Sequence, residues 1–509
     1  MKPGLNDPMR RMRADPEGPA YFRAVRHADG IQTVGLWLST LAVLALRLAG
    51  PDAASIQLVL LVLAGWMVAV EAYLFMRNDT FILRGKTAYL LGFFTYILLS
   101  PTLGSIYTYP AAPRAVATAV GACLLFLSSV MTMYCAVDGT RPMHRSVLEG
   151  FVVSIDPRRL MNLLLLCFVP AILLRILLQD WSTVTSVLAG LFGIGSQPWR
   201  HTGFGNSLVV FAPIHWLYAL VPGISGLGWA LGARYKPLRP LVVMVWLFVF
   251  PALMLQRSRG LLISSLVLVL ASILLVSNDR RVRRNLYLVF ILLLPLVTML
   301  ANLLLVDRGS GRVATQMVEG SLDEYQLEAD PRTLMEDNLY YFTGTAGVVP
   351  DVVPHRSALE LYYYMAINPI PRVLWPDKPW MSQKYLGKIR PYYAAITIVG
   401  DFYVYGGWWH VLIGGLVFGW VLKRIDIFGK SKANPETGRV LLYASLILAL
   451  FFSIRALWSL VVSIYSILTL MILLWMIRHQ VNRAGNAGCQ NASIFGAILQ
   501  KDSNSKSEE

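Results

Sequence analysis

The stretch SIQLVLLVLAGWMVAVEAYLFM at residues 55–76 decides the fold class of this chain, because it carries a single charged side chain, Glu71. An α-helix rises about 1.5 Å per residue, so about 20 apolar residues cross the ~30 Å hydrocarbon core of a bilayer. Similar runs recur along the 509 residues, which are 56% hydrophobic and 15% charged. An average soluble domain carries roughly 25% charged residues, so the composition excludes an ordinary soluble protein and a mostly disordered one.

Apolar runs of this length predict an all-α polytopic membrane protein with about twelve transmembrane helices. The runs are continuous rather than alternating, which argues against an outer-membrane barrel. The shorter apolar segment 183–195 is predicted to be re-entrant or interfacial. The predicted spans are 32–49, 55–76, 87–107, 114–136, 159–179, 206–230, 240–256, 260–277, 285–306, 398–422, 439–455 and 457–477.

Positive charge alternates along this map, as expected when Lys and Arg gather in cytoplasmic loops. The loops after the even-numbered spans are basic, whereas the short loop PDAAS at 51–55 has no positive charge. We therefore predict that both termini are cytoplasmic and that the first span is an uncleaved signal anchor. The net charge of +16 then reflects the orientation of the chain in its membrane rather than binding to nucleic acid.

One connection departs from this pattern, because it is long and of mixed charge. It falls on the outer face between the ninth and tenth spans, and loops of this length are often functional. Its apolar pieces, such as Leu359 to Ile367, predict short helices on the membrane surface. The predicted organisation is a basic cytoplasmic N-terminus (1–31), transmembrane helices 1–9 (32–306), a large periplasmic loop (307–397), transmembrane helices 10–12 (398–477) and a disordered cytoplasmic tail (478–509).

Arginines cluster at the predicted outer ends of several spans. Arg257 and Arg259 lie in the tight turn LQRSRGLL, and Arg308 and Arg312 lie in LVDRGSGR. An arginine at membrane depth is costly unless it pairs with an anion, lines a wet cavity or reaches the interface. Arginine also suits bidentate contact with phosphate, so the cluster predicts a lipid phosphate or pyrophosphate site. For any one of these residues, contact with phospholipid headgroups is the plainer interpretation.

The block NPIPRVLWPDKP at 368–379 is the second candidate feature. Its prolines forbid a regular helix and hold an extended path. That path presents Arg372, Trp375, Asp377 and Lys378. Aromatic platforms beside charged groups are typical of sugar sites, although a proline-rich surface turn has the same composition.

The third feature is GDFYVYGGWWHVLIGGLVFGWVLKR at 400–424, where Asp401 and Tyr403 enter the tenth span from outside. An acid at a helix N-terminus is stabilised by the helix dipole, so capping is an alternative role for Asp401. The glycines of this span predict close helix packing. His355 lies in the outer loop, where it is either a base or simply exposed. His215 and His410 fall within spans, where a structural hydrogen bond is the better interpretation.

Known cofactor motifs are absent from the sequence. It has no HExxH or CxxC spacing, no Walker loop and no GxSxG, and its outer segment has no DxD. We therefore predict no metal and no cofactor. The four cysteines fall in apolar runs or in the polar tail, which argues against a structural disulfide.

These residues resemble the Wzy-type oligosaccharide repeat-unit polymerases of the bacterial O-antigen polymerase and ligase group. The resemblance rests on SRG at 258–260, on NPIPRVLWPDKP and on GDFYVYGG at 400–407. It implies a C-type glycosyltransferase fold and a metal-independent reaction at the periplasmic face. An undecaprenyl-pyrophosphate-linked glycan would be transferred onto the sugar of another lipid-linked repeat unit. A chain-length regulator and a flippase are the implied protein partners.

The charged residues fit that chemistry. Cations close to a leaving pyrophosphate stabilise the transition state in place of a metal, and the acceptor hydroxyl needs a base within hydrogen-bond reach. The candidate bases are Asp401, then Asp377, then His355. The candidate pyrophosphate and substrate ligands are Arg257, Arg259, Arg308, Arg312, Arg372, Lys378, Trp375 and Tyr403.

Three other functions remain open from the sequence. An O-antigen ligase shares the fold and the donor, and His355 suits the outer-loop base that the ligases are expected to carry. A flippase or transporter of lipid-linked glycans also suits about twelve spans, although no internal repeat is visible. A structural or scaffold membrane protein is the third alternative, but it would not explain the arginine cluster at the outer face.

Overall fold

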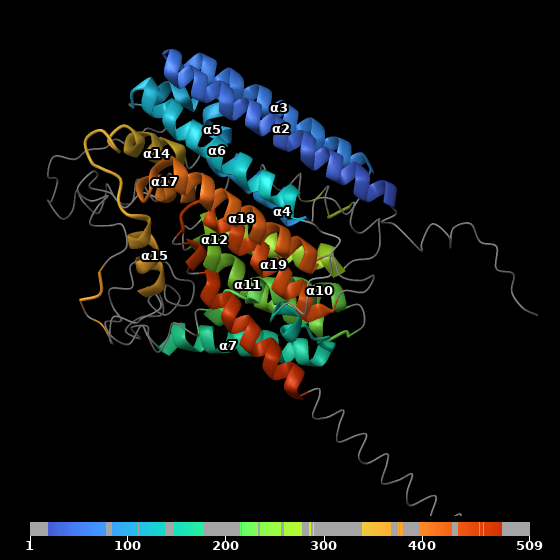
Figure 1. Cartoon of the computed structure of the whole chain (residues 1–509). Coiled ribbons are helices and arrows are strands. Elements are labelled where there is room, and N and C mark those ends of the chain that lie inside the picture. Colours follow the sequence, from blue (N-terminus) through green and yellow to red (C-terminus); the bar gives the residue numbers. More distant parts are fainter. Residues whose placement is uncertain are drawn as a thin grey trace, which may run out of the picture. The chain divides into compact units, whose positions relative to one another are not determined.

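In the computed structural model, every regular element of the described residues is a helix (Figure 1). Within those residues there is no strand. The described residues are 19–77, 84–109, 111–137, 147–177, 214, 216–232, 235–255, 259–276, 285–286, 289, 338–367, 375, 377–379, 396–429, 436–457, 459–461 and 463–480.

The chain divides into two compact units, and each is described by itself. The first unit comprises Met1–Arg141, Leu322–Ile427 and Ala449–Val461. The second comprises Pro142–Ser321, Phe428–Leu448 and Val462–Glu509. Each unit therefore combines segments from distant parts of the sequence.

The first unit is built on a layer of long helices. Helix α2 packs along both α3 and α6 (Figure 1). Asp52 caps the start of α3, because its carboxylate accepts hydrogen bonds from the backbone N–H and the hydroxyl of Ser55. The elements are α2 (Pro19–Ala49), α3 (Ala53–Arg77), α4 (Gly85–Phe93), the π-helix η2 (Phe94–Leu98), α5 (Leu99–Thr102), the 3-10 helix η3 (Ser105–Thr108), α6 (Pro113–Ala136), α14 (Asn338–Ala346), α15 (Ala358–Ile367), α17 (Thr397–Val404) and α18 (Gly407–Gly429).

The second unit is also built from helices. In this unit, Arg439 connects segments that the charge rule predicts to be cytoplasmic. Its guanidinium donates to both carboxylate oxygens of Glu149, at 2.9 and 2.8 Å, and to Glu436. The elements are the 3-10 helix η4 (Val147–Phe151), α7 (Pro157–Leu177), α10 (Val221–Leu231), α11 (Leu238–Leu255), α12 (Arg259–Val276), most of α19 (Thr437–Ser453) and most of the last helix, Ser459–Gln480.

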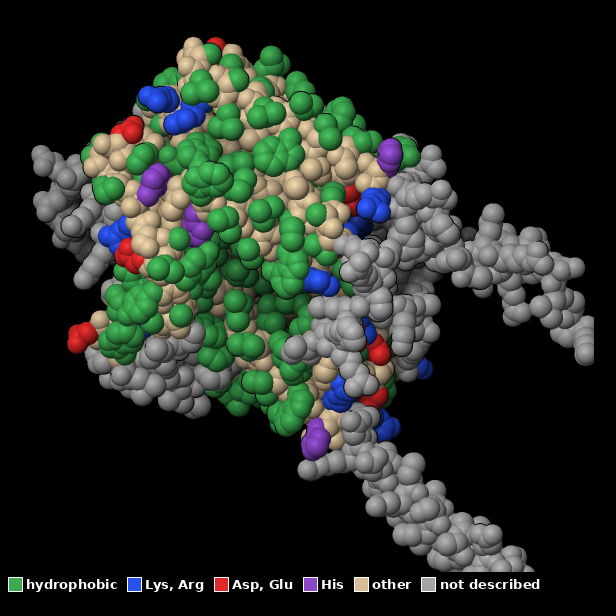
Figure 2. All heavy atoms as spheres, in the orientation of Figure 1, with side chains coloured by type: hydrophobic (Ala, Val, Ile, Leu, Met, Phe, Trp, Pro, Cys, Tyr) green, Lys and Arg blue, Asp and Glu red, His purple; other side chains and the backbone are tan. Residues whose placement is uncertain are grey.

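Within the described residues, four helices are long and apolar enough to cross a membrane. They are Arg26–Ala49, Ala53–Tyr73, Pro113–Ala136 and Ser459–Gln480. Hydrophobic side chains cover much of the face drawn in Figure 2, as expected of helices that meet lipid rather than water. Several large apolar side chains of α2 are exposed, among them Leu38, Leu41 and Leu48, at 62%, 59% and 83% exposure. The prediction of a helical membrane protein is confirmed at this level.

Two predicted spans differ from the structure. The span 398–422 is not one helix, since α17 ends at Val404 and α18 begins at Gly407. The break occurs because Gly406 and Gly407 adopt φ values of 147° and 66°, which side-chain-bearing residues rarely adopt. The span 87–107 is divided into α4, η2, α5 and η3. Helix α2 also begins earlier than predicted, at Pro19.

Several predictions lie outside the described residues. These are most of the span 285–306, the loop 307–337, the segment 183–195 and the tail after 480. The predicted helix Leu359 to Ile367 is confirmed as α15.

Candidate functional site

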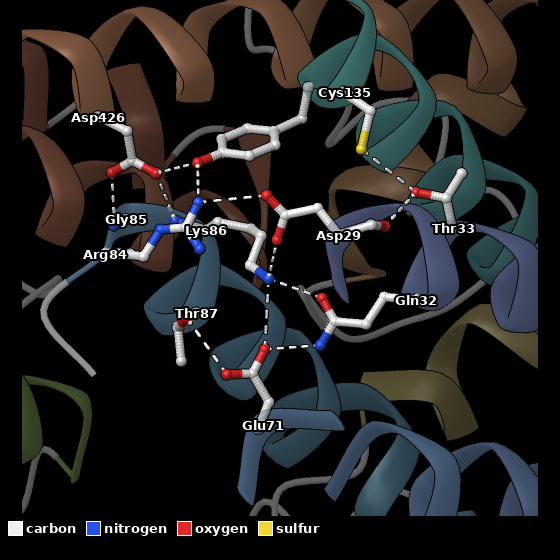
Figure 3. Close-up of polar contacts among 11 residues, drawn as sticks. Asp29, Gln32, Thr33, Glu71, Arg84, Gly85, Lys86, Thr87, Cys135 and Asp426 are labelled. Carbon is white, nitrogen blue, oxygen red and sulfur yellow. Dashed lines mark hydrogen bonds and ion pairs between the residues drawn. The ribbon is translucent and has the colours of Figure 1, made fainter. Parts of the chain in front are cut away.

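The first unit has polar groups at both ends of its helix layer. The lengths of α2, α6 and α18 separate these two ends. One end carries the N-terminus of α2 and the C-termini of α3, α6 and α18 (Figure 3). The opposite end carries the C-terminus of α2 and the N-termini of α6 and α18, and the loop helix α14 packs there against α6 and α17. The described part of the long loop therefore lies at one end of the helix layer.

At the first end, charges pair with each other inside the protein (Figure 3). Lys86 is completely buried, and its ammonium contacts Asp29 at 2.8 Å, Gln32 at 2.6 Å and Glu71 at 3.4 Å. Asp426, at the end of α18, accepts the backbone N–H groups of Gly85 and Lys86 and so caps α4. Because these groups satisfy one another and are shielded, we interpret the network as a clamp on helix ends rather than a ligand site.

The loop end carries a row of four side chains, which we call the outer row: His355, Tyr403, Trp408 and Arg47. The rings of His355 and Tyr403 meet edge to face at 5.1 Å between centroids, and those of Tyr403 and Trp408 at 5.7 Å. The Arg47 guanidinium carbon lies 5.6 Å from the centroid of the Trp408 ring. The row joins the loop to α17, α18 and the end of α2.

His355 enters this row because the backbone fixes its segment. The next residue, Arg356, donates its backbone N–H to the Val404 carbonyl at 2.9 Å. The Tyr403 hydroxyl donates to the Val349 carbonyl at 3.3 Å. The His355 side chain is half-buried, and its Nδ1 atom is buried without a hydrogen-bond partner in the described structure. A buried ring nitrogen without a partner is a group that a ligand or an ordered water can satisfy.

Sequence reasoning did not select Arg47, although it lies in the same row. Its Nε atom donates to the Thr118 hydroxyl at 2.8 Å, which aims the guanidinium across the end of α6. The side chain is half-buried. The available clue was positional: Arg47 ends an apolar run directly before a loop that the charge rule predicts to be external and that has no other positive charge.

A second group of polar side chains connects α15 to the turn between α17 and α18. Arg356 and Glu360 form an ion pair one helical turn apart, and the Tyr364 hydroxyl donates to the same Glu360 oxygen at 3.0 Å. Burial raises the pKa of Tyr364, and its hydrogen bond to this carboxylate raises it further, so the phenol remains a donor. On the other side of α15, the Tyr362 hydroxyl lies 2.8 Å from His410 Nε2.

Asp401, the first candidate base, has a structural contact. Its carboxylate is buried and accepts the backbone N–H of Leu457 at 3.0 Å. Leu457 lies between the end of α19 and the start of the last helix, at Ser459. Asp401 therefore caps the start of another helix, whereas the capping alternative placed it at the N-terminus of its own span.

The other candidates are placed less fully. Asp377 is exposed, whereas Trp375 and Lys378 are half-buried and the Lys378 backbone N–H donates to the Trp375 carbonyl. Arg259 begins α12 in the second unit. The candidates Arg257, Arg308, Arg312 and Arg372 lie outside the described residues. Of the predicted site residues, the structure thus brings His355 and Tyr403 into contact, with Asp401 on the same helix as Tyr403.

Two further features bear on ligands. No group of three or more His, Cys, Asp or Glu side chains that could hold a metal occurs within the described part of the chain. In the second unit, α10, α11 and α12 border an apolar groove of about 440 Å³ lined by residues such as Trp229, Trp246 and Phe250. Its lining offers contact to a hydrocarbon chain and no reactive group.

Comparisons with protein-family models, with curated proteins and with solved structures each found no match.

Proposed function

We propose that this chain is a metal-independent membrane glycosyltransferase that polymerises lipid-linked glycan repeat units at the periplasmic face of the bacterial inner membrane. In this proposal the chain has about twelve spans and cytoplasmic termini, as the charge pattern predicts. The observation that supports it is the outer row, in which a loop histidine and a membrane-end arginine are linked through Tyr403 and Trp408.

The proposed reaction requires a base for the acceptor hydroxyl and, at a different position, a cation for the leaving pyrophosphate. The acceptor hydroxyl attacks the anomeric carbon of the donor sugar, the bond from that carbon to the pyrophosphate oxygen breaks, and the pyrophosphate leaves as an anion on its lipid. His355 accepts the proton of the attacking hydroxyl, and Arg47 stabilises the charge that develops on the leaving group. The proton balance closes when the imidazolium later releases its proton to water.

The position of Arg47 suits a lipid phosphate. It lies at the end of the helix Arg26–Ala49, where an arginine can keep its charge in the headgroup region while its stem packs on apolar surface. Its contact with the Trp408 ring and its bond to Thr118 fix the guanidinium, which lowers the entropy cost of binding an anion. The candidate cations Arg257, Arg259, Arg308, Arg312 and Arg372 remain proposed pyrophosphate ligands.

His355 is a better candidate base than Asp401 in this geometry. Asp401 is 6% exposed and its carboxylate already accepts a helix N–H, whereas the His355 side chain as a whole is only half-buried. A base must reach the proton that it removes, so accessibility decides between the two. Asp377 is exposed and stays an alternative.

A ligase that transfers the same donor to lipid A core is the second candidate function. The observation that favours it is again His355, because an outer-loop histidine is the base that ligases of this group are expected to carry. The two functions differ in their products and not in the chemistry at the anomeric carbon.

The test is the size-resolved profile of lipid-linked glycans in a deletion strain. We expect single repeat units to accumulate, and the wild-type gene to restore long chains. His355→Ala and Arg47→Gln should not restore them, although the protein inserts normally. Matched controls on exposed residues of α2, His27→Ala and Arg26→Gln, should restore wild-type chains.

The outcomes separate the candidate functions. Long polymer that persists on its lipid carrier in the deletion strain identifies a ligase. Repeat units confined to the cytoplasmic leaflet identify a flippase. Wild-type chain length with both His355→Ala and Arg47→Gln would reject the outer row as the reaction centre.

A further inference from the structure

The apolar groove of the second unit lies between α10, α11 and α12 and is open on one side. Its volume of about 440 Å³ is within the usual range of ligand pockets. Helix α11 contributes Val243, Leu247 and Phe250 to its lining, and these three residues are 41–67% exposed. Because the three helices fall within predicted spans, the groove is expected to open into hydrocarbon rather than water.

The packing of the three helices accounts for this groove. A Cβ atom on Gly226 of α10 would collide with the backbone of Val269 in α12, so these two helices touch by their backbones. Helix α11 contacts α12 at far fewer positions than α10 does. The side chains of α11 and α12 therefore leave space between them, with α10 as the floor of the groove.

A cation lies at one end of the groove. The guanidinium carbon of Arg239, in the first turn of α11, is 5.4 Å from the centroid of the ring of Trp229, which lines the groove. The Arg239 stem passes over Gly232, where a Cβ atom would collide with it. These contacts hold the guanidinium beside the groove, yet the side chain is exposed and forms no ion pair with a carboxylate of the described residues.

An apolar groove that ends at an unneutralised arginine matches the two parts of an anionic phospholipid. A guanidinium suits bidentate contact with a phosphate, and tryptophan beside arginine is typical of the membrane–water interface. The α11 residues that line the groove extend from Val242 to Phe250, which is about 12 Å along a helix. That length covers most of the ~15 Å of hydrocarbon in one leaflet, so an acyl chain fits along it.

We propose that this groove binds one anionic phospholipid, with an acyl chain against α11 and α12 and the phosphate paired with Arg239. We call the groove together with Arg239 the lipid site. The charge rule places Arg239 on the cytoplasmic side, so the lipid comes from the cytoplasmic leaflet. The polyprenyl donor of the proposed reaction acts at the opposite face. The lipid site therefore goes beyond the glycan chemistry, and it shares no residue with the outer row.

Native mass spectrometry of the full chain in detergent counts bound lipid directly. The probe is phosphatidylglycerol, and the comparison is phosphatidylcholine with the same acyl chains. We expect one phosphatidylglycerol to be retained at detergent concentrations that remove phosphatidylcholine. Arg239→Gln should weaken this binding about 10-fold or more, because it removes a charge-assisted hydrogen bond. The control Arg158→Gln removes an exposed arginine of α7 on the same predicted side and should bind as the wild type does.

A matched pair of variants on α11 tests the groove itself. Val243 lines the groove and is 46% exposed, whereas the next residue, Met244, is 47% exposed and does not line it. Val243→Trp should fill the groove and abolish retention of phosphatidylglycerol, whereas Met244→Trp should retain it. Without added lipid, the two variants should unfold at the same temperature, since both positions are equally exposed. Added phosphatidylglycerol should then raise the unfolding temperature of Met244→Trp and of the wild type, but not that of Val243→Trp.

Three results would overturn the lipid site. The first is equal retention of phosphatidylglycerol and phosphatidylcholine, which would mean that the headgroup is not recognised. The second is wild-type retention by Arg239→Gln or by Val243→Trp. The third is preferential retention of undecaprenyl phosphate when it is offered together with phosphatidylglycerol, which would assign the groove to the polyprenyl carrier. None of these results depends on the glycan profile of the deletion strain, so the lipid site and the proposed function are tested separately.

Discussion

Lys86 shows how strongly one side chain can depend on its partners. Its ammonium is completely buried and contacts Asp29, Gln32 and Glu71, while its backbone N–H is capped by Asp426 (Figure 3). A buried cation is tolerated when opposite charges and hydrogen bonds surround it. If the cation is removed, its carboxylate partners become buried charges without compensation, which destabilises the fold. The position is therefore sensitive to substitution although it is far from the outer row.

Lys86→Met should destabilise the first unit by about 3–5 kcal/mol, because Asp29 keeps a buried negative charge with one cation fewer. Thermal unfolding in detergent checks this, together with the amount of protein inserted in the membrane. The double variant Lys86→Met/Asp29→Asn should recover part of the loss. The exposed control Arg158→Met should stay within about 0.5 kcal/mol of wild type. A stable Lys86→Met protein would contradict the clamp.

Asp401 offers a second test at the scale of one residue. Asparagine keeps an oxygen that can accept the Leu457 N–H, whereas alanine has none. We expect Asp401→Asn to retain polymer synthesis and Asp401→Ala to lose about 0.5–2 kcal/mol of stability. Lipid-linked glycan profiles and thermal unfolding measure the two effects. Loss of polymer in a stable Asp401→Asn protein would restore Asp401 as the candidate base.

At the scale of elements, α6 and α18 approach each other where glycines remove side chains. A Cβ atom on Gly415 would lie 2.6 Å from the Phe126 carbonyl oxygen, and one on Gly419 would lie 2.2 Å from that of Val130. The obstruction is backbone, which cannot rotate aside as a side chain can. The predicted close packing of this span is confirmed at both glycines, which are spaced four residues apart on one helix face.

Gly419→Val should therefore separate α18 from α6 and destabilise the first unit by at least about 1–3 kcal/mol. Insertion level and thermal unfolding provide the measurement. Gly65→Val is the matched control, because a Cβ at Gly65 of α3 meets nothing within 4 Å. Equal stability of the two variants would show that α6 and α18 do not pack at this distance.

The turn between α17 and α18 makes a related prediction about the site. Gly407 has a φ of 66°, and a Cβ there would lie 3.1 Å from His355 Nε2. Gly407→Ala should reduce polymer synthesis more than it reduces protein level, because it strains the turn and pushes the imidazole away. The ratio of polymer to inserted protein is the measurement. An unchanged ratio would mean that the position of His355 does not matter.

At the scale of the whole molecule, orientation in the membrane is the main prediction. The charge rule places Ser154 in a cytoplasmic loop and Val352 in the periplasmic loop. Both residues are exposed in the structure. In a background without the four native cysteines, Val352→Cys should react with an impermeant maleimide on intact spheroplasts, and Ser154→Cys only after permeabilisation. Labelling of both from the same side would refute the predicted topology.

The amino-acid sequence alone determined the helical membrane class and the positions of most of the long described helices. α3, α6, α7, α11, α12 and α19 begin and end within a few residues of the predicted spans. This agreement has a local cause: a long apolar run must satisfy its own backbone hydrogen bonds when lipid replaces water, and a helix does so within the segment. The helix at Leu359 to Ile367 was predictable from its short apolar run.

Only the tertiary structure decided which side chains meet. The union of Arg47 with Trp408 and His355 joins positions that lie hundreds of residues apart in the sequence, and Asp401 caps a helix break that follows α19. The division of the predicted span 398–422 likewise depends on the φ values of two glycines. The hydropathy of a segment indicates whether it lies in lipid or in water, whereas the contacts between segments depend on which helix faces pack together. The outer row arises from that packing.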